Sequence, residues 1–233
     1  SDIPESRWAH SVTLDDYYIC TTEVTNALWE TVTGYLPYDK LDDPDGIFNN
    51  ELPSHPVSAV SWTEINEVFL PSISRLTGFN MELPSEAEWE YAATGGINHD
   101  SFNYSGSSIL NEVAWHFSNC WGKQPVGKLK PNSLGIYDMS GNVSEWCADW
   151  YQVGYDSVDG VINPKGPSSG TERVVRGGNY SDAANFDLGS FYVKARSSTI
   201  PGCYNGCWGN TGHPDEPVCF SCYNIGFRFV LKY

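Results

Sequence analysis

The chain has few basic residues and no long apolar run. Lysine and arginine number 13 among 233 residues, against 29 aspartates and glutamates, so the formal net charge is −16. This charge repels the phosphates of nucleic acid and of anionic membranes, and both are therefore poor partners. No stretch approaches the roughly 18 apolar residues of a membrane-spanning helix, so no membrane insertion is expected. No repeat or low-complexity linker divides the chain, and residues 1–233 are predicted to form a single domain.

Aromatic residues, glycine and proline are plentiful. The chain contains nine Trp, 14 Tyr and 10 Phe, together with 22 Gly and 14 Pro. This composition favours a loop-rich fold held by a few large anchors over a helical bundle.

Helix signals are confined to the first part of the chain. Residues 12–20 indicate one or two strands, and a short helix is predicted over residues 26–33, ending at Gly34. A second helix starts at a capping box, Ser61 with Glu64, and Pro71 should kink or interrupt it.

A third helix starts at the same kind of box, Ser85 with Glu88, and places Trp89 on a buried face. After about residue 97 the sequence indicates short strands and turns. Helices followed by irregular β-structure predict an α+β domain with two to three short helices and little regular secondary structure.

Several segments together resemble one protein family. They are Glu23-Val24-Thr25-Asn26, His55-Pro56-Val57, Leu83-Pro84-Ser85-Glu86-Ala87-Glu88-Trp89-Glu90-Tyr91, Leu134-Gly135-Ile136-Tyr137-Asp138-Met139-Ser140-Gly141-Asn142-Val143, Arg176-Gly177-Gly178 and Ile225-Gly226-Phe227-Arg228. In this order they resemble the formylglycine-generating-enzyme (sulfatase-modifying factor) family. The resemblance implies a C-type-lectin-like fold with twisted antiparallel strands. It leaves function open, because members include oxidases, sulfoxide synthases and binding proteins.

The resemblance allows a test for catalysis. In the oxidase branch, two thiolates that hold Cu(I) follow the Arg-Gly-Gly motif, and the matching residues here are Asp182 and Asp187. Carboxylates are hard oxygen donors that suit soft Cu(I) badly, and they cannot form a mixed disulfide with a thiol substrate. None of the five histidines is spaced as a ligand pair on one element. We therefore expect no copper and no catalytic residue; the alternative is an enzyme of the same family with a noncanonical site near these aspartates.

A calcium-binding loop is implied by the same resemblance. Its ligands would be the side chains of Asp138 and Glu145 and the carbonyls of Gly141 and Val143. Calcium takes six to eight hard oxygens of these kinds, and its role here would be to lock the loop. The alternative is a turn without metal.

Residues 177–231 have an unusual composition. Only three of these 55 residues are Lys, Glu, Gln, Met or Trp, whereas residues 1–176 contain 30 of them. Codons that end in a pyrimidine cannot encode these five types. The pattern resembles the variable region of proteins that diversity-generating retroelements diversify at adenines, and these proteins use the same scaffold. The alternative is a fixed binding surface, because strands and loops avoid several of these residues in any case.

Either interpretation makes residues 177–231 a ligand-binding region, because aromatics supply rigid contact area and small polar residues adapt their hydrogen bonds. The candidate contacts are Tyr180, Asp182, Asn185, Phe186, Asp187, Tyr192, Tyr204, Asn205, Trp208, Phe220 and Tyr223. The expected ligand is a protein or a glycan on another surface. The domain would then act on a cell surface, a virion surface or a secreted particle.

An insertion relative to the family, residues 198–224, is rich in cysteine. Its cysteines are Cys203, Cys207, Cys219 and Cys222. Two disulfides or one tetrahedral zinc site would staple this loop, and free or diversified thiols are the third option. Cys120 and Cys147 are either buried thiols or a further pair.

Overall fold

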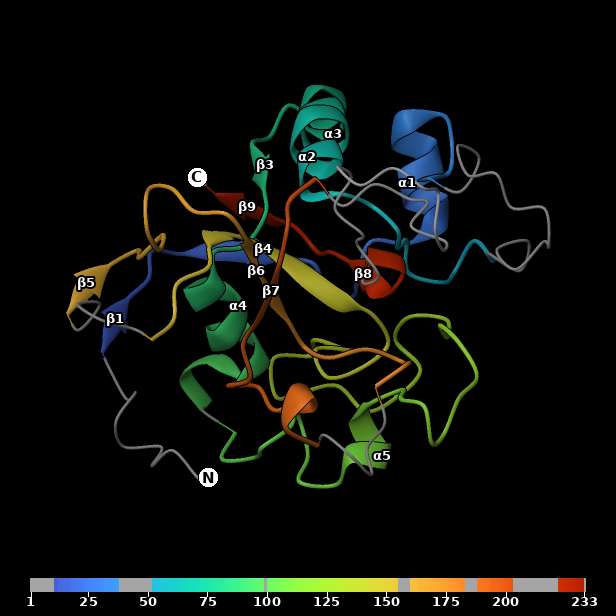
Figure 1. Ribbon diagram of the computed structural model, residues 1–233, viewed down its shortest axis with the longest axis vertical. Coiled ribbons are helices and arrows are strands. Elements are labelled where there is room, and N and C mark those ends of the chain that lie inside the picture. Colours follow the sequence, from blue (N-terminus) through green and yellow to red (C-terminus); the bar gives the residue numbers. More distant parts are fainter. Residues whose placement is uncertain are drawn as a thin grey trace, which may run out of the picture.

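The computed structural model describes residues 11–37, 52–98, 100–154, 160–182, 188–202 and 222–232. Its elements are β1 (Val12–Thr13), β2 (Tyr17–Ile19), α1 (Asn26–Thr33), α2 (Trp62–Glu64), η3 (Ile65–Phe69), α3 (Leu70–Thr77), β3 (Met81–Glu82), α4 (Glu86–Ala93), η4 (Gly96–Asn98), α5 (Leu110–Val113), β4 (Ser144–Trp150), β5 (Val161–Ile162), β6 (Arg173–Arg176), η5 (Leu188–Phe191), β7 (Ser197–Thr199), η6 (Cys222–Asn224), β8 (Ile225–Gly226) and β9 (Val230–Lys232). Short elements joined by long loops confirm the α+β class, as Figure 1 shows.

The first predicted helix is confirmed as α1. Thr25 caps its start, because the side-chain oxygen accepts a hydrogen bond from the Leu28 N–H at 3.2 Å. Gly34 ends it in the left-handed conformation, with φ at 83°. Trp29 on its inner face is fully buried and anchors the helix to the core.

The second predicted helix forms in three parts, α2, η3 and α3. Ser61 caps it by accepting from the Glu64 N–H at 3.0 Å. The middle part is π-helical, with the Leu70 N–H donating to the Ile65 carbonyl, and α3 then begins with Pro71 in its first turn. Proline has no N–H and disrupts a continuous α-helix, so the predicted interruption takes the form of a π-helical segment.

The third predicted helix is confirmed as α4. Its capping box is complete: the Glu88 N–H donates to Ser85 Oγ at 3.2 Å, and the Ser85 N–H donates to Glu88 Oε2 at 2.7 Å. Trp89 is fully buried, as its position predicts. Beyond residue 97 in the described part, the helices α5, η5 and η6 are each one short turn.

Three small sheets connect distant parts of the chain. Their strand orders are β7-β6-β4-β8, β2-β9-β3 and β1-β5. The expected antiparallel pairing is confirmed for β2–β9, β3–β9, β4–β6 and β6–β7, whereas β4 pairs with β8 and β1 with β5 in parallel. Each parallel pair joins segments far apart in the sequence, which a local turn signal cannot predict.

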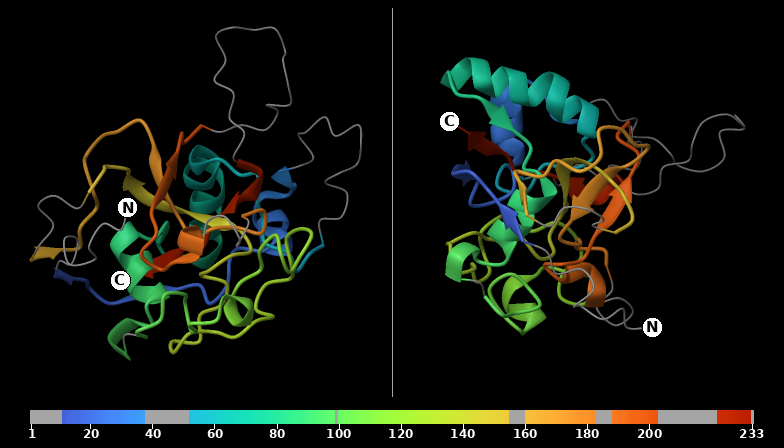
Figure 2. Two further views of the ribbon diagram at one scale, coloured as in Figure 1. Left: turned by 60° about the horizontal axis from the view of Figure 1, so that its bottom comes forward. Right: turned by 90° about the vertical axis from the view of Figure 1, so that its left-hand side faces the viewer.

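The four-stranded sheet separates two hydrophobic clusters. Trp146 on β4 packs into a cluster with helices α1, η3 and α3, where Trp29 stacks on Phe69 with 5.2 Å between ring centroids. Cys147, the next residue, packs with Trp89 of α4 in the second cluster. Alternate side chains of a strand point to opposite faces, so β4 contributes to both clusters. Figure 2 shows the sheet between α3 and the loops around α5.

Across the part of the chain that the structure describes, we find no helix with the length and apolar character to cross a membrane.

Candidate functional site

Arg176 fixes the start of the segment that the sequence predicts to vary. It ends β6 and its side chain is fully buried. The guanidinium contacts Glu86 Oε1 at 2.8 Å and Glu90 Oε2 at 2.5 Å, and it donates to the Val193 carbonyl at 2.7 Å. Charge-assisted hydrogen bonds of this kind hold β6, α4 and the end of the 188–193 stretch in one arrangement.

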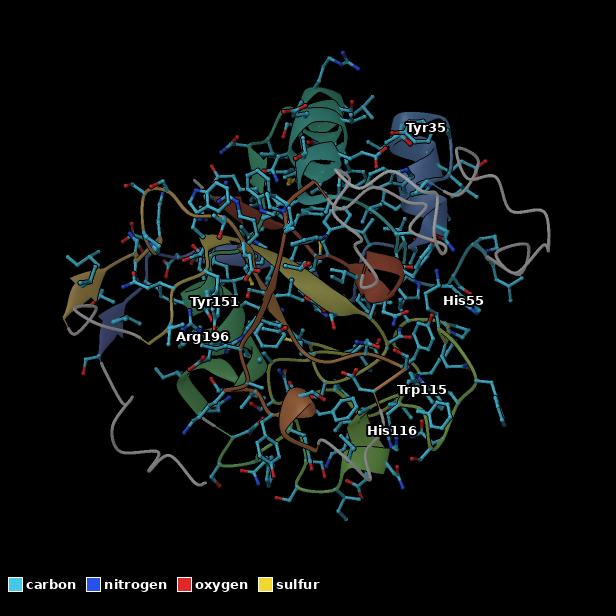
Figure 3. All side chains as sticks on the ribbon, viewed as in Figure 1. Tyr35, His55, Trp115, His116, Tyr151 and Arg196 are labelled. Carbon is cyan, nitrogen blue, oxygen red and sulfur yellow. The ribbon has the colours of Figure 1, made fainter. Side chains whose placement is uncertain are left out.

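Asp149 lies beside this ion-pair network. Burial, followed by the neighbouring Glu86 and Glu88 carboxylates, raises the pKa of Asp149 to about 7. The Glu86 N–H, which donates to Asp149 Oδ2 at 2.8 Å, and the charge of Arg196 act in the opposite direction. Figure 3 shows Arg196 next to Tyr151, and its guanidinium lies 5.0 Å from the centre of that ring.

The glycine after Gly177 permits a close backbone approach. Gly178 has φ of 68°, and a Cβ atom there would lie 3.0 Å from the Ser190 carbonyl oxygen and from Phe191 Cδ1. Only glycine accommodates both the positive φ and this contact without strain. The chain therefore passes from buried β6 to the surface while it touches the 188–193 stretch.

A tight turn follows the glycines. The Asn179 N–H donates to Asp182 Oδ2 at 3.1 Å, and the Asp182 N–H donates to the Asn179 carbonyl at 3.1 Å. The Ser181 N–H donates to Asn179 Oδ1 at 3.0 Å. Asp182, which the sequence resemblance matches to a copper-binding thiolate of the oxidases, thus contributes its carboxylate to its own turn.

Asn142 ties this turn to the buried frame beneath it. The Tyr180 N–H donates to the Asn142 carbonyl at 2.8 Å, and the Asn142 N–H donates to the Trp115 carbonyl at 2.9 Å. The Asn142 side chain is fully buried and pairs with both backbone groups of Gln124, at 2.9 and 3.2 Å. One asparagine thereby joins three loops.

The 188–193 stretch alternates anchors with a displayed side chain. Phe191 and Val193 are buried, whereas Tyr192 between them is 37% exposed. The Tyr192 ring lies 5.4 Å from the ring of Tyr104, and the Phe191 ring lies 5.7 Å from that of His116. The anchors hold the backbone while Tyr192 faces solvent.

The C-terminal part of the candidate region lies beside the first part. Asn224 Nδ2 donates to Ser181 Oγ at 2.6 Å. The strand that follows, β8, pairs with β4, and a Cβ atom on Gly226 would lie 2.4 Å from the Val57 carbonyl oxygen. The fold therefore brings the partly exposed residues 223–224 beside residues 179–182, while β8 that follows is buried.

The structure tests the placement of only some predicted ligand contacts. Tyr180, Asp182 and Tyr223 are partly exposed and Tyr192 is exposed, all on the segments that the contacts above join. The remaining candidates lie outside the described residues: Asn185, Phe186, Asp187, Tyr204, Asn205, Trp208 and Phe220. Ligand binding by any of them stays a prediction.

Glu145, an implied calcium ligand, is engaged by a buried arginine. Its Oε1 lies 2.7 Å from Arg228 Nη2, and its Oε2 accepts from Arg228 Nε and from Trp89 Nε1, each at 2.7 Å. All three side chains are fully buried. Both carboxylate oxygens thus accept charge-assisted or neutral hydrogen bonds inside the core, and a calcium ion at Glu145 would have to share this carboxylate with Arg228 and Trp89.

Asp138 has one carboxylate oxygen that is not engaged in a hydrogen bond. Its Oδ2 accepts from the Gly127 N–H at 2.6 Å, whereas its buried Oδ1 has no hydrogen-bond partner. Burial raises the pKa of Asp138, and burial together with the charges of Asp138 and Glu145 raises that of nearby Glu23 well above its ordinary value. Among the described residues, no three His, Cys, Asp or Glu side chains are grouped to hold a metal. Calcium at Asp138, Gly141, Val143 and Glu145 stays a prediction.

The described cysteines are not paired. Cys20, Cys120 and Cys147 are free, and burial raises the pKa of each thiol. Of the two alternatives for Cys120 and Cys147, buried thiols or a disulfide pair, the structure therefore shows buried thiols. Cys203, Cys207 and Cys219, and the side chain of Cys222, lie outside the described residues, so a disulfide or zinc staple stays a prediction.

Sequence reasoning missed the fixed loop beside the candidate surface. Residues 116–121 carry Phe117, 58% exposed, and Trp121, 98% exposed. The Phe117 N–H donates to the Asp182 carbonyl at 3.2 Å. No local pattern marks this loop, because tryptophan and phenylalanine are usually found buried.

The short helices, the curled sheets and the long ordered loops define a C-type-lectin-like domain of the formylglycine-generating type. Residues 3–210 match the family model described as sulfatase-modifying factor enzyme 1-like domain, and the chain belongs to this family.

Relatives in this family include enzymes and a variable protein. The formylglycine-generating enzyme of Thermomonospora curvata is 32% identical in an alignment 191 positions long that covers 74% of this chain and 59% of that enzyme. That of Mus musculus is 30% identical in an alignment 243 positions long, gaps included, that covers 83% of this chain and 64% of the enzyme. The chain thus spans about three fifths of the length of these relatives. The structure of Treponema denticola variable protein 1 matches with a TM-score of 0.76 and 27% identity, covering 96% of this chain and 87% of that one.

Proposed function

We propose that this chain is a non-enzymatic ligand-binding domain that displays a variable surface on a fixed C-type-lectin-like scaffold, and that a diversity-generating retroelement varies this surface. The observation that carries the proposal is the hydrogen bond from Asn224 Nδ2 to Ser181 Oγ, at 2.6 Å. It places the two ends of the compositionally unusual region side by side. A binding surface needs such continuity, because contacts must be presented together to one ligand.

The scaffold supports variation because the residues that fix its backbone are not the residues whose side chains reach the surface. Arg176, Gly178 and Phe191 fix the backbone through buried contacts or close approach. Tyr180 and Tyr192 on the same segments are partly exposed, Tyr192 at 37%. Surface substitutions away from packed contacts change stability little, so exposed positions tolerate change while the anchors keep the shape.

The chemistry around Asp182 supports binding over catalysis. Its carboxylate closes a turn with the Asn179 N–H at 3.1 Å, in the place where the oxidases of the family carry a copper-binding thiolate. The described thiols, Cys20, Cys120 and Cys147, have raised pKa values, which disfavours the reactive thiolate. The similarity to Treponema denticola variable protein 1 agrees with this assignment.

The locus that encodes the chain provides the experiment. We expect a near-identical repeat of the segment for residues 177–231 downstream, beside a reverse transcriptase gene, with differences concentrated at adenines. A locus without the repeat overturns the diversification. Copper-dependent turnover of a thiol peptide by the purified domain overturns the non-enzymatic assignment and favours an enzyme with a noncanonical site.

A further inference from the structure

We propose that the aromatic loop, residues 116–121, is a constant docking element that receives a basic polypeptide side chain next to the variable surface. This inference rests on the proposed function and adds to it the partner class and a contact outside residues 177–231. It starts from two rings in solvent. Trp121 is 98% exposed and Phe117 is 58% exposed, with 6.3 Å between the ring centroids. Large exposed aromatics of this kind mark interaction sites.

The loop that presents the rings is held firmly. His116 is buried, and its Nδ1 accepts from the Ser118 N–H at 3.3 Å while its Nε2 lies 2.7 Å from Asn111 Oδ1. With Nδ1 as the acceptor, the ring proton is on Nε2 and is donated to Asn111. Burial lowers the pKa of His116, which favours this neutral ring. The His116 side chain therefore spans the loop from its inner side.

Backbone contacts close the same loop. The N–H groups of Asn119 and Cys120 both donate to the His116 carbonyl, at 2.9 and 3.0 Å. The Asn119 side chain accepts from the His116 N–H at 2.9 Å and donates to the Ala114 carbonyl at 2.9 Å. Figure 3 shows Trp115 and His116 at the start of this loop, beside α5. A preformed loop loses little freedom on binding, which raises the affinity that two exposed rings can provide.

The aromatic loop is continuous with the proposed variable surface. The Phe117 N–H donates to the Asp182 carbonyl at 3.2 Å, and the Phe191 ring packs 5.7 Å from His116. A ligand that covers residues 180–182 thus lies next to Phe117. The loop precedes residue 177, so it offers the same contact whatever residues the variable positions carry.

Charge and ring geometry select the partner class. The chain has a net charge of −16, which attracts a cationic partner over long range. Lys123 next to the loop has its ammonium on Ser58 Oγ at 2.9 Å. The Phe117 and Trp121 rings pack against each other at 60°, and Trp121, at 98% exposure, keeps ring surface open to solvent. An arginine or lysine side chain on this open ring surface would gain a cation–π contact with Trp121.

Selection of a display library of random peptides for binding to the whole chain tests this inference. We expect enriched peptides rich in arginine or lysine, whose affinity falls by about tenfold or more in Trp121→Ala and in Phe117→Ala. Phe79→Ala is the matched control, because Phe79 is also 58% exposed and follows α3, at the opposite end of the molecule from α5 in Figure 1. This control should change affinity by less than about twofold, because Phe79 lies outside the proposed contact and hot-spot residues carry most of the binding energy.

Tyr180→Ala and Tyr223→Ala separate this inference from the proposed function. If only these two variants weaken binding, the proposed function stands and the docking loop is wrong. If only the two loop variants weaken binding, the docking loop stands and the variable surface loses its role. The docking loop is also overturned if basic peptides are enriched no more strongly on the wild-type chain than on the Phe117→Ala/Trp121→Ala double variant. It is overturned as well if a glycan array shows Trp121-dependent binding of a glycan and the library yields no basic peptide.

Discussion

Asn142 connects the buried frame of the domain to the proposed variable surface. It is fully buried with φ of 59°, a left-handed conformation that asparagine tolerates better than most residues. Its side chain pairs with Gln124 and its carbonyl accepts from the Tyr180 N–H. The Tyr180 contact uses only backbone atoms, so it persists when the side chain at residue 180 changes.

At the same scale, Asp149 gives a pH-dependent prediction. Its pKa is about 7 in the folded chain and 3.8 without burial, so the folded state binds the proton more tightly between these values. Titration of Asp149 therefore lowers the free energy of unfolding as pH rises from about 4 to about 7, and it causes no further change above that range. From about pH 5 to about pH 7, the wild-type free energy of unfolding should fall by on the order of 1 to 2 kcal/mol relative to that of Asp149→Asn.

Urea unfolding followed at several pH values measures this difference. The amide oxygen that Asp149→Asn introduces would still accept from the Glu86 N–H, so the substitution removes the titration while it retains the hydrogen-bond acceptor. Parallel pH profiles for the two chains would contradict the raised pKa.

At the scale of elements, the parallel contact between β4 and β8 depends on Gly226. A Cβ atom there would lie 2.4 Å from the Val57 carbonyl oxygen and 3.0 Å from Val143 Cγ2. Gly226→Ala should therefore lower the free energy of unfolding by about 1–3 kcal/mol, because the backbone must shift. Gly202→Ala is the control, since its Cβ would meet no atom within 4 Å. Equal thermal stability of both variants would contradict the close approach.

Elements with local signals were predictable, and those with distant partners were not. The Ser85–Glu88 box and Gly34 act within one or two helical turns, so the sequence alone locates α4 and α1. The one-turn helix α5 has no side-chain cap and was missed. The pairing of β4 with β8 joins residues 144 and 225, and no local pattern encodes it.

The candidate site was predictable to a similar extent. Composition directed attention to residues 177–231, and the fold brings Ser181 and Asn224 of this region together. The exposure of Trp121 depends on tertiary packing, which residue type does not reveal. The buried contact between Glu145 and Arg228 also joins residues 83 positions apart, so the sequence could not show that an arginine occupies this carboxylate.

At the scale of the whole molecule, two clusters on either side of the four-stranded sheet form the constant part. Figure 2 shows η5, which carries Phe191, on the side of the molecule away from α3. Buried anchors such as Phe191 connect the loops of the candidate surface to the core. We therefore expect that recognition residues can change without affecting the fold.

A substitution set on the purified chain tests that claim most directly. Tyr180, Tyr192 and Tyr223 are each replaced by asparagine, serine and aspartate, singly and together, and Phe191→Ala serves as the anchor variant. We predict that each surface substitution changes the free energy of unfolding by less than about 1 kcal/mol, whereas Phe191→Ala lowers it by about 3–5 kcal/mol. Surface variants that unfold the domain as strongly as Phe191→Ala would contradict a variable surface on a fixed scaffold.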